Sequence, residues 1–288
     1  MSPGDTSPCA ICQGRTATPV SRINDYTIWR CDNCSVCFSD ALYRVDLAGL
    51  YMKSYFSGQH VSTGYADYHR LSSALERNAV RRLRRLEGLL GQDRALLDVG
   101  CGTGEFLRVA AERGWQCAGV EISPYAAEYG RARYGLDISE GALTANLFPT
   151  HAFSAITLWD VVEHLPDPLT TLAICAQLLK PKGVLAISTG DIGSLCARVC
   201  GRYWHLFNLP EHVFFFSRRT IRDLVKRAGF EVLSIAYPSS VYPLGYLLER
   251  LYKSAFRRVR STPDFRCAWL VRCNLFDIME VLGTPLHH

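Results

Sequence analysis

The chain has 288 residues, of which 48% are hydrophobic and 20% charged, and this ordinary globular composition excludes a disordered or collagen-like chain. Its formal net charge of +5 is mildly basic, whereas a dedicated nucleic-acid binder is usually more basic and more clustered. No apolar run approaches the roughly 18 residues that span a membrane, and residues 1–6 show no signal-peptide pattern, so we expect a cytoplasmic protein with reduced thiols.

Two C-x-x-C pairs near the N-terminus predict a structural zinc site. The first pair is Cys9 and Cys12, and the second is Cys31 and Cys34. Each pair suits a tight turn, so four thiolates can point at one ion and form the closed tetrahedral shell that structural zinc prefers; the alternative is four incidental buried cysteines. We expect residues 20–30 to form one strand returning from one pair to the other, as in a zinc ribbon. Cys37 is expected to pack on the strand that leaves the site, and most of the remaining seven cysteines are expected in the core.

Three parts are expected along the chain: a zinc-ribbon-like module over residues 1–40, a tyrosine-rich connector and helix over 41–94, and an α/β domain over 95–288. The helix is indicated by Leu75, Ala79, Leu83, Leu86 and Leu90, which recur at helical spacing. Arginines 81, 82, 84 and 85 are interpreted as the solvated face of this helix, because they form one short stripe beside glutamates.

From residue 95 onward, strand and helix patterns alternate. The predicted strands are 95–100, 117–122, 138–143, 155–160, 183–189, 231–237 and 274–282. The predicted helices are 105–113, 124–134, one that Asp167 caps and one that Ser217 caps. Such alternation predicts a parallel sheet with helices on both faces. Residues 244–266 form an insertion that we interpret as a packed helix, with a lid, an interaction face or a membrane-surface helix as alternatives.

A glycine turn follows the first strand of this region and carries the binding chemistry. Gly100, Gly102 and Gly104 allow a sharp turn and a close backbone approach to a ligand. Glu105 in the next helical turn would repel a pyrophosphate but tolerate a cationic ligand. Glu121 ends the next strand, where a carboxylate can accept hydrogen bonds from both hydroxyls of a ribose. Together these residues predict an adenosine-type ligand at the carboxyl edge of the sheet.

Residues 98–104, Glu121, the block 159–168 and the block 178–183 resemble, in this order, the motifs of class I S-adenosylmethionine-dependent methyltransferases. The resemblance implies S-adenosyl-L-methionine as cofactor and a Rossmann-like sheet of seven strands, the last inserted antiparallel between its neighbours. In this family the glycines pass under the methionine part, the strand-end acid holds the ribose, and residues 142–143 lie near the adenine. The implied cofactor-binding residues are Asp98, Gly100, Cys101, Gly102, Gly104, Glu121, Ile122, Ala142, Leu143 and Trp159.

Methyl transfer to a hydroxyl group requires alignment, exclusion of water and removal of a proton. Two histidines lie in loops expected at the carboxyl edge, and a near-neutral imidazole suits a base. We expect His212 to act as the base, with His164 as the second choice and Asp160 beside the reacting groups; either histidine could instead have a packing role. A divalent ion on Asp160, Glu163 and His164, with His212 as a possible fourth ligand, is an alternative, because the D-x-x-E-H set resembles those that bind such ions in some related O-methyltransferases.

The leading functional hypothesis is a methyltransferase that acts on a small molecule or saccharide, with oxygen as the expected acceptor atom. The zinc-type N-terminus and the tyrosine-rich connector also resemble a subset of bacterial methyltransferases, some of which act on sugars. One alternative is an RNA methyltransferase, although residues 1–40 carry three arginines against four aspartates, so no specific nucleic-acid partner is expected. Another is a non-catalytic scaffold that retains the fold. The sequence leaves the acceptor and the oligomeric state open.

Overall fold

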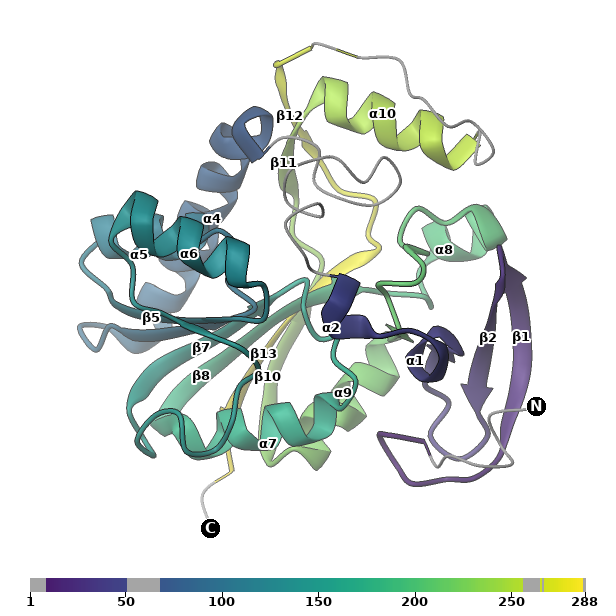
Figure 1. Ribbon diagram of the computed structural model, residues 1–288, viewed down its shortest axis with the longest axis horizontal. Coiled ribbons are helices and arrows are strands. Elements are labelled where there is room, and N and C mark those ends of the chain that lie inside the picture. Colours follow the sequence, from purple (N-terminus) through teal and green to yellow (C-terminus); the bar gives the residue numbers. More distant parts are fainter. Residues whose placement is uncertain (1–8, 51–67, 256–264, 266, 287–288) are drawn as a thin grey trace.

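The computed structural model describes residues 9–50, 68–255, 265 and 267–286, which form a central sheet, an N-terminal sheet and a small ribbon (Figure 1). The central sheet has the strand order β10-β13-β8-β7-β4-β5-β6. Its strands are β4 (Ala95–Val99), β5 (Gln116–Glu121), β6 (Ile138–Glu140), β7 (Phe153–Trp159), β8 (Leu179–Gly190), β10 (Phe230–Ala236) and β13 (Ile278–Pro285). The predicted Rossmann-like α/β sheet of seven strands is therefore confirmed.

Strand β13 is the inserted antiparallel strand. It pairs antiparallel with both β8 and β10, whereas the other pairs of this sheet are parallel. Its predicted start at residue 274 was wrong, because residues 274–277 form a turn before the strand. Asn274 accepts a hydrogen bond from the Phe276 amide at 2.8 Å, and Phe276 has a left-handed φ of 54°.

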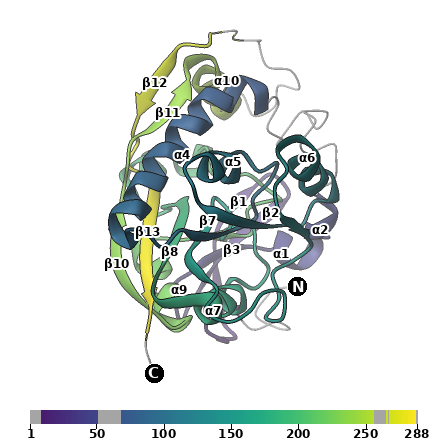
Figure 2. The same cartoon turned by 90° about the vertical axis from the view of Figure 1, so that its left-hand side faces the viewer.

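Helices cover both faces of the central sheet, and three of them begin at a capping side chain (Figures 1 and 2). One face carries α4 (Tyr68–Leu90), α5 (Glu105–Glu112) and α6 (Pro124–Tyr134), and the other carries α7 (Pro168–Leu178) and α9 (Arg218–Arg227). Ser123, Asp167 and Ser217 cap α6, α7 and α9 by accepting a hydrogen bond from the third residue of the helix, as predicted for the last two.

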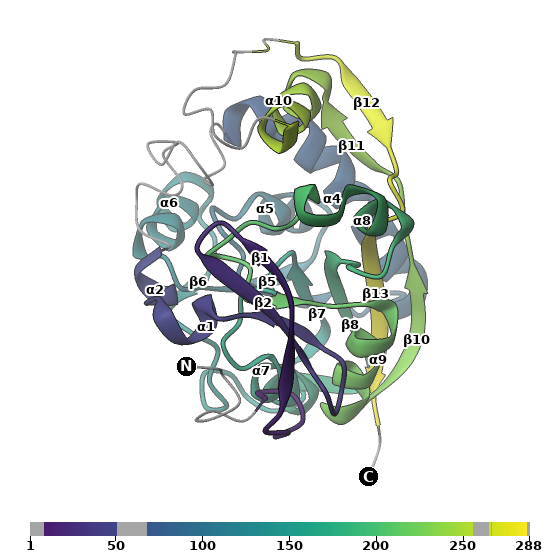
Figure 3. The ribbon, with the colours of Figure 1, turned by 90° about the vertical axis from the view of Figure 1, so that its right-hand side faces the viewer.

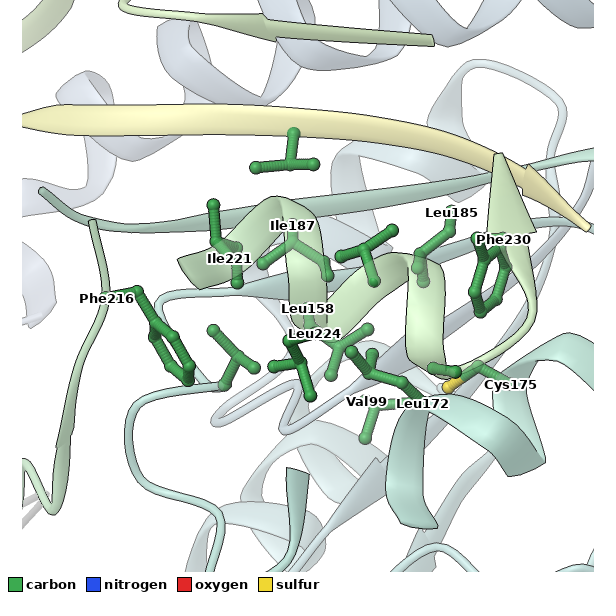
Figure 4. Packing of buried hydrophobic residues seen from close by; sticks show 14 of the residues in the cluster. Val99, Leu158, Leu172, Cys175, Leu185, Ile187, Phe216, Ile221, Leu224 and Phe230 are labelled. Carbon is green, nitrogen blue, oxygen red and sulfur yellow. The ribbon is translucent and has the colours of Figure 1, made fainter. Parts of the chain in front are cut away.

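The strands divide their side chains between two hydrophobic layers, because successive residues of a strand point to opposite faces. In β4, Leu96 packs toward α4 and α5, whereas Leu97 and Val99 pack toward α7 and α9. Figure 4 shows the second layer, where Leu185 and Ile187 of β8 meet residues of α7 and α9. Both layers lie beneath the carboxyl edge and hold the strand ends in place.

The N-terminal sheet has the order β1-β2-β3-β9 and combines two distant parts of the chain (Figure 3). It consists of β1 (Ala17–Ile23), β2 (Tyr26–Cys31), β3 (Cys37–Ser39) and β9 (Phe214–Phe215), and the short helices α1 (Ala41–Arg44) and α2 (Leu47–Leu50) follow β3. The single strand expected over residues 20–30 was wrong, because Asn24, with a left-handed φ of 53°, turns the chain between β1 and β2. Cys37 is buried on β3, as expected.

Two insertions complete the fold. The first contains α8 (Leu195–Cys200) and the short 3₁₀ helix η2 (Gly201–Tyr203); the second contains β11 (Ser240–Pro243), α10 (Leu244–Ala255) and β12 (Leu270–Cys273). The tyrosine-rich stretch 51–67 and the basic residues 257, 258, 260 and 266 lie outside the described residues. Within the part of the chain that the structure describes, no helix is both long and apolar enough to cross a bilayer.

Three of the four arginines interpreted as a solvated face of α4 are bound to a buried acid instead, and only Arg84 is exposed as expected. Arg81, Arg82 and Arg85 converge on Glu280 of β13, with N–O distances of 2.5, 3.1 and 3.6 Å. The carboxylate is buried, and the positive charges of Arg81 and Arg82, together with their hydrogen bonds, hold its pKa below the usual range although burial opposes this. The arginines therefore brace α4 against the antiparallel strand.

Candidate active site

The glycine turn lies between β4 and α5 and has the backbone that its residues predict. Gly100, Gly102 and Gly104 have φ values of 71°, 56° and 87°, in the left-handed region that favours glycine. A Cβ at Gly100 would lie 2.6 Å from Val161, and one at Gly104 would lie 2.5 Å from Leu136. The first and third glycines are therefore required for packing as well as for the turn.

Glu121 is held in place by the same turn. One carboxylate oxygen accepts a hydrogen bond from the Gly102 amide and the other from the Ser123 amide, both at 2.8 Å. Burial raises the pKa of Glu121, although these backbone hydrogen bonds oppose the rise. The carboxylate is thus positioned before any ligand arrives, and each oxygen can accept a further hydrogen bond.

The remaining residues expected around the cofactor differ in exposure. Ile122 is 40% exposed and Ala142 is exposed at the carboxyl edge, whereas Leu143 is buried. The thiol of Cys101 packs against β5, where a Cβ on Gly119 would come within 2.7 Å of its sulfur, so its side chain points into the sheet. Asp98 is buried beside Thr157, and burial raises the pKa of its carboxyl to about 7.

Trp159 ends β7 with its ring between two helices. The guanidinium of Arg82 lies 4.1 Å from the ring centroid, and Phe106 of α5 meets the ring edge-on at 5.4 Å. The indole Nε1 is buried and has no hydrogen-bond partner among the described residues. A buried donor without an acceptor is costly, so this atom is available to a bound ligand.

Asp160 follows Trp159 with a left-handed φ of 57°. Its carboxylate accepts a hydrogen bond from the hydroxyl of Ser188 at 2.8 Å, and this hydroxyl also accepts one from Arg82 at 3.3 Å. Burial raises the pKa of Glu163 to about 8, and the negative charge of Asp160 contributes to this rise. Asp160 thus lies at the carboxyl edge, linked through Ser188 to the arginines of α4.

The two histidines singled out from sequence are in contact. The rings of His164 and His212 meet edge-on with centroids 4.6 Å apart. His164 Nδ1 lies 3.0 Å from the carbonyl oxygen of Glu211. A carbonyl only accepts, so Nδ1 carries the proton and the lone pair of His164 is on Nε2. Burial lowers the pKa of His164 to about 4, which keeps this imidazole neutral near pH 7.

Backbone hydrogen bonds join the two loops that carry these histidines. The carbonyl of Glu163 accepts hydrogen bonds from the amides of Val213 and Phe214, both at 3.0 Å. The amide of Ser39 at the end of β3 donates to the carbonyl of Val213 at 2.8 Å. The N-terminal sheet is therefore attached directly to the loop that carries His212.

Two groups of possible metal ligands occur among the residues expected to bind ions. Cys9, Cys12, Cys31 and Cys34 have sulfur atoms within 4.8 Å of one another. The second group joins Glu163 and His164 to His212 rather than to Asp160. The expected set is therefore corrected at Asp160, whose carboxylate turns toward Ser188, while the loop at 208–213 brings His212, the possible fourth ligand, to Glu163.

Sequence reasoning missed the side chains that support this site. Arg82 stacks on Trp159, Ser188 bonds to Asp160, and Asn208 lies 3.4 Å from Nε2 of His212. None belongs to a recognisable motif, since a lone serine, asparagine or arginine is common in any loop or helix. Arg82 is one of the arginines singled out on α4, but the sequence pattern does not indicate which residues it contacts.

Comparisons with known proteins agree with this geometry. Residues 69–235 match the family described as "Methyltransferase domain". The ubiquinone biosynthesis O-methyltransferase of Nitrosospira multiformis is 31% identical over 188 residues, which cover 59% of this chain and 77% of that protein. The protein of the same name from Cereibacter sphaeroides is 31% identical over 147 residues, covering 47% of this chain and 60% of that protein.

Solved structures show the same fold at low sequence identity. A putative sarcosine dimethylglycine methyltransferase from Galdieria sulphuraria has a TM-score of 0.52 at 18% identity and covers 83% of this chain and 98% of that chain. The YcgJ protein of Bacillus subtilis also has a TM-score of 0.52, at 14% identity, with coverage of 74% and 99%.

A sheet with an inserted antiparallel strand, a glycine turn and a strand-end acid define an S-adenosylmethionine-dependent methyltransferase fold. The chain belongs to the methyltransferase domain family, and it is an S-adenosylmethionine-dependent methyltransferase.

Proposed function

We propose that this enzyme transfers the methyl group of S-adenosylmethionine to an oxygen atom of a small molecule, including a saccharide. The observation that carries this proposal is the contact between His164 and His212, two imidazoles of which one has a defined lone pair at Nε2. The curated relatives named above are O-methyltransferases, which supports oxygen as the acceptor atom.

The cofactor supplies an activated methyl group on a sulfonium. We propose that Gly100, Gly102 and Gly104 pass beneath its methionine part and that Glu121 accepts hydrogen bonds from its ribose hydroxyls. The adenine would be surrounded by Ile122, Ala142 and Leu143. The backbone of Asp98 and Cys101 would contact the cofactor from below, and Trp159 would lie near its methionine part. The exposed Ile122 offers an apolar surface for a flat ring.

At the acceptor end, His212 is proposed to remove the hydroxyl proton. His164 packs edge-on against it, and Phe215 lies 6.4 Å from its ring centroid, so the surroundings limit the entry of water. Asp160, held by Ser188, would stand beside the acceptor and favour the cationic imidazolium that forms.

A divalent ion is the alternative at this end, held by Glu163, His164 and His212. Glu163 Oε2 is buried without a hydrogen-bond partner among the described residues, and His164 Nε2 carries a lone pair, so the donor set fits an ion. Such an ion would polarise the acceptor oxygen. Loss of turnover on chelation, with recovery on adding a divalent ion, would favour this alternative over the base.

The N-terminal cysteines are proposed to hold one structural zinc. Sulfur pairs lie 3.8 Å apart for Cys9 and Cys34 and 3.5 Å apart for Cys12 and Cys31. Around a tetrahedral zinc with bonds of about 2.3 Å, sulfur atoms lie about 3.8 Å apart, so the four thiols fit. The hydrogen bond from Cys34 lowers the pKa of Cys9 to about 5, so a thiolate forms readily there.

The variant Cys34→Ser tests this zinc. We expect zinc content to fall by one equivalent and residues 9–40 to become more sensitive to protease, while S-adenosylmethionine affinity changes little. Cys117→Ser, a partly buried cysteine of the central sheet, is the control. A Cys34→Ser protein with unchanged zinc content would contradict the site.

We also propose the three-part organisation over residues 1–40, 41–94 and 95–288 and a cytoplasmic location. All twelve cysteines are free, which supports a reducing compartment.

The decisive experiment supplies S-adenosylmethionine with a ¹³C-labelled methyl group and candidate hydroxylated acceptors from extract fractions. The carbon chemical shift of the labelled product tells a methyl on oxygen from one on nitrogen or carbon. A product methylated on oxygen is expected. A methyl group on carbon or nitrogen would contradict the proposal. If calorimetry detects no binding of S-adenosylmethionine, the alternative of a non-catalytic scaffold is favoured.

A further inference from the structure

A third group of metal-ligand side chains lies away from the cysteines of the N-terminal sheet and from the histidine pair. Cys196 of α8, His205 after η2 and Asp277 before β13 place one ligand atom each within 4.8 Å of the others. The insertion after β8 supplies two of these residues, and a segment more than 70 residues later supplies the third. The fold, rather than a motif, therefore assembles the group.

The carboxylate of Asp277 is buried and lies at a distance from His205 that suits two ligands of one metal ion. The residue is only 2% exposed, and its Oδ2 accepts a hydrogen bond from the indole nitrogen of Trp204 at 2.9 Å. Nδ1 of His205 lies 3.5 Å from the same oxygen. This is longer than the 2.7–3.2 Å of an ordinary N–H···O hydrogen bond, but it matches the roughly 3.4 Å between nitrogen and oxygen ligands of a tetrahedral zinc.

Helix α8 carries two cysteines near this carboxylate. Cys196 and Cys200 are four residues apart and so lie on one side of α8. Burial, followed by the charge of Asp277 and a hydrogen bond to it, raises the pKa of Cys196 to about 12. Cys200 also contacts Cys196 and offers a second sulfur.

We propose that Cys196, His205 and Asp277 form a second zinc site. A mixed set of sulfur, nitrogen and oxygen donors suits Zn²⁺ and not the oxygen-preferring Mg²⁺ or Ca²⁺. The Trp204 indole would orient the carboxylate, as outer hydrogen bonds do at many metal sites. The ion would tie the α8 insertion to the start of β13, and the site is independent of the proposed methyl transfer.

Zinc stoichiometry tests the proposal. Metal-free, reduced full-length protein is titrated with Zn²⁺ in competition with a chromophoric chelator. We expect one zinc equivalent that Cys196→Ser and His205→Ala each remove, and that Cys34→Ser and the control Cys273→Ser both retain. Unchanged stoichiometry in both Cys196→Ser and His205→Ala would overturn the proposal.

A second measurement on the unmodified protein covers the case in which these variants do not fold. X-ray absorption of the zinc-loaded chain is expected to show nitrogen or oxygen neighbours at about 2.0–2.1 Å besides sulfur at about 2.3 Å. A shell of sulfur alone would overturn the second site. Neither readout depends on methyl transfer, so failure here is distinguishable from failure of the proposed function.

Discussion

The two ends of the proposed active site are built in different ways. At the cofactor end, residues 95–143 form three neighbouring strands, and the contact from Glu121 to Gly102 joins residues 19 apart. At the acceptor end, the contact from His164 to Glu211 joins residues 47 apart, and Ser39 reaches Val213 across most of the chain. A short continuous segment makes one end, and several distant segments make the other.

This difference extends to electrostatics. Glu121 is buried but accepts two backbone hydrogen bonds, which partly offset the cost of its charge. Glu163 is buried to the same degree but lies beside the negative charge of Asp160, and burial and that charge raise the pKa of its carboxyl to about 8. The cofactor end is thus prepared to bind as it stands, whereas the acceptor end contains groups whose protonation changes near neutral pH. The following variants test that contrast, from the largest expected effect to the smallest.

Removing the imidazole of the acceptor end should affect turnover alone. His212→Ala should lower kcat by about 10²–10⁴-fold, the usual worth of a positioned base, with little change in S-adenosylmethionine affinity. His151→Ala is the matched control, because that ring bonds to the Leu179 carbonyl near the opposite ends of the strands. Steady-state kinetics and calorimetry measure the two quantities, and near-normal turnover in His212→Ala would remove the base role.

Removing the negative charge of Glu121 at the cofactor end should lower the affinity for S-adenosylmethionine. Glu121→Gln should weaken S-adenosylmethionine binding by about 10–100-fold, since hydrogen bonds to a charged group contribute about 1.5–3 kcal/mol. Glu140→Gln, at the exposed end of the adjacent strand β6, is the control. Calorimetry gives the Kd, and equal affinities for the two variants would show that Glu121 does not hold the cofactor.

The brace between α4 and β13 belongs to neither end but positions Ser188 and Trp159. Glu280→Gln should lower the free energy of unfolding by about 1–3 kcal/mol; the loss is smaller than for a fully buried ion pair because the arginines remain partly exposed. Glu112→Gln, in an exposed pair with Arg108, is the control.

The pH dependence of this loss has a definite sign. Because the folded-state pKa of Glu280 is lowered, its stabilisation is present above the ordinary pKa of 4.5 and disappears as the pH falls below it. The difference in Tm between wild type and Glu280→Gln should therefore shrink in acid. An equal difference at pH 7 and well below pH 4 would contradict the ion pair.

Glu163 should respond to pH in the opposite sense. Its folded-state pKa is raised from 4.5 to about 8, so its contribution to stability is complete below pH 4.5 and is lost as the pH rises through about 8. Glu163→Gln should flatten the fall in Tm over that interval, as thermal unfolding at a series of pH values can show. An unchanged profile would mean that Glu163 is charged in the folded protein.

Local patterns were enough for much of the fold. An early proline marks α6, a buried apolar run marks β4, and the glycine spacing marks the turn before α5. These features act over a few residues, where backbone sterics and capping hydrogen bonds decide the conformation. The order of the strands came from the family resemblance, because pairing in a parallel sheet is not encoded by any one segment.

Where several conformations were locally acceptable, the sequence was misread. Residues 20–30 suit a strand throughout, yet a left-handed Asn24 divides them into a hairpin. Leu275 and Phe276 have apolar side chains that suit a strand, yet the hydrogen bond from the Phe276 amide to Asn274 turns the chain there. Single side-chain contacts decided these boundaries, and such contacts have no periodic signature.

The sequence by itself determined the cysteine pairs, the glycine turn, the strand-end acid and the two histidines as candidates. Only the tertiary structure decided their partners: it turned Asp160 toward Ser188, placed His212 beside His164 and closed three arginines around Glu280. The reason is physical, because the energy of a buried charge or imidazole depends on groups that arrive from distant segments. Those groups come together only when the sheet and its insertions have packed.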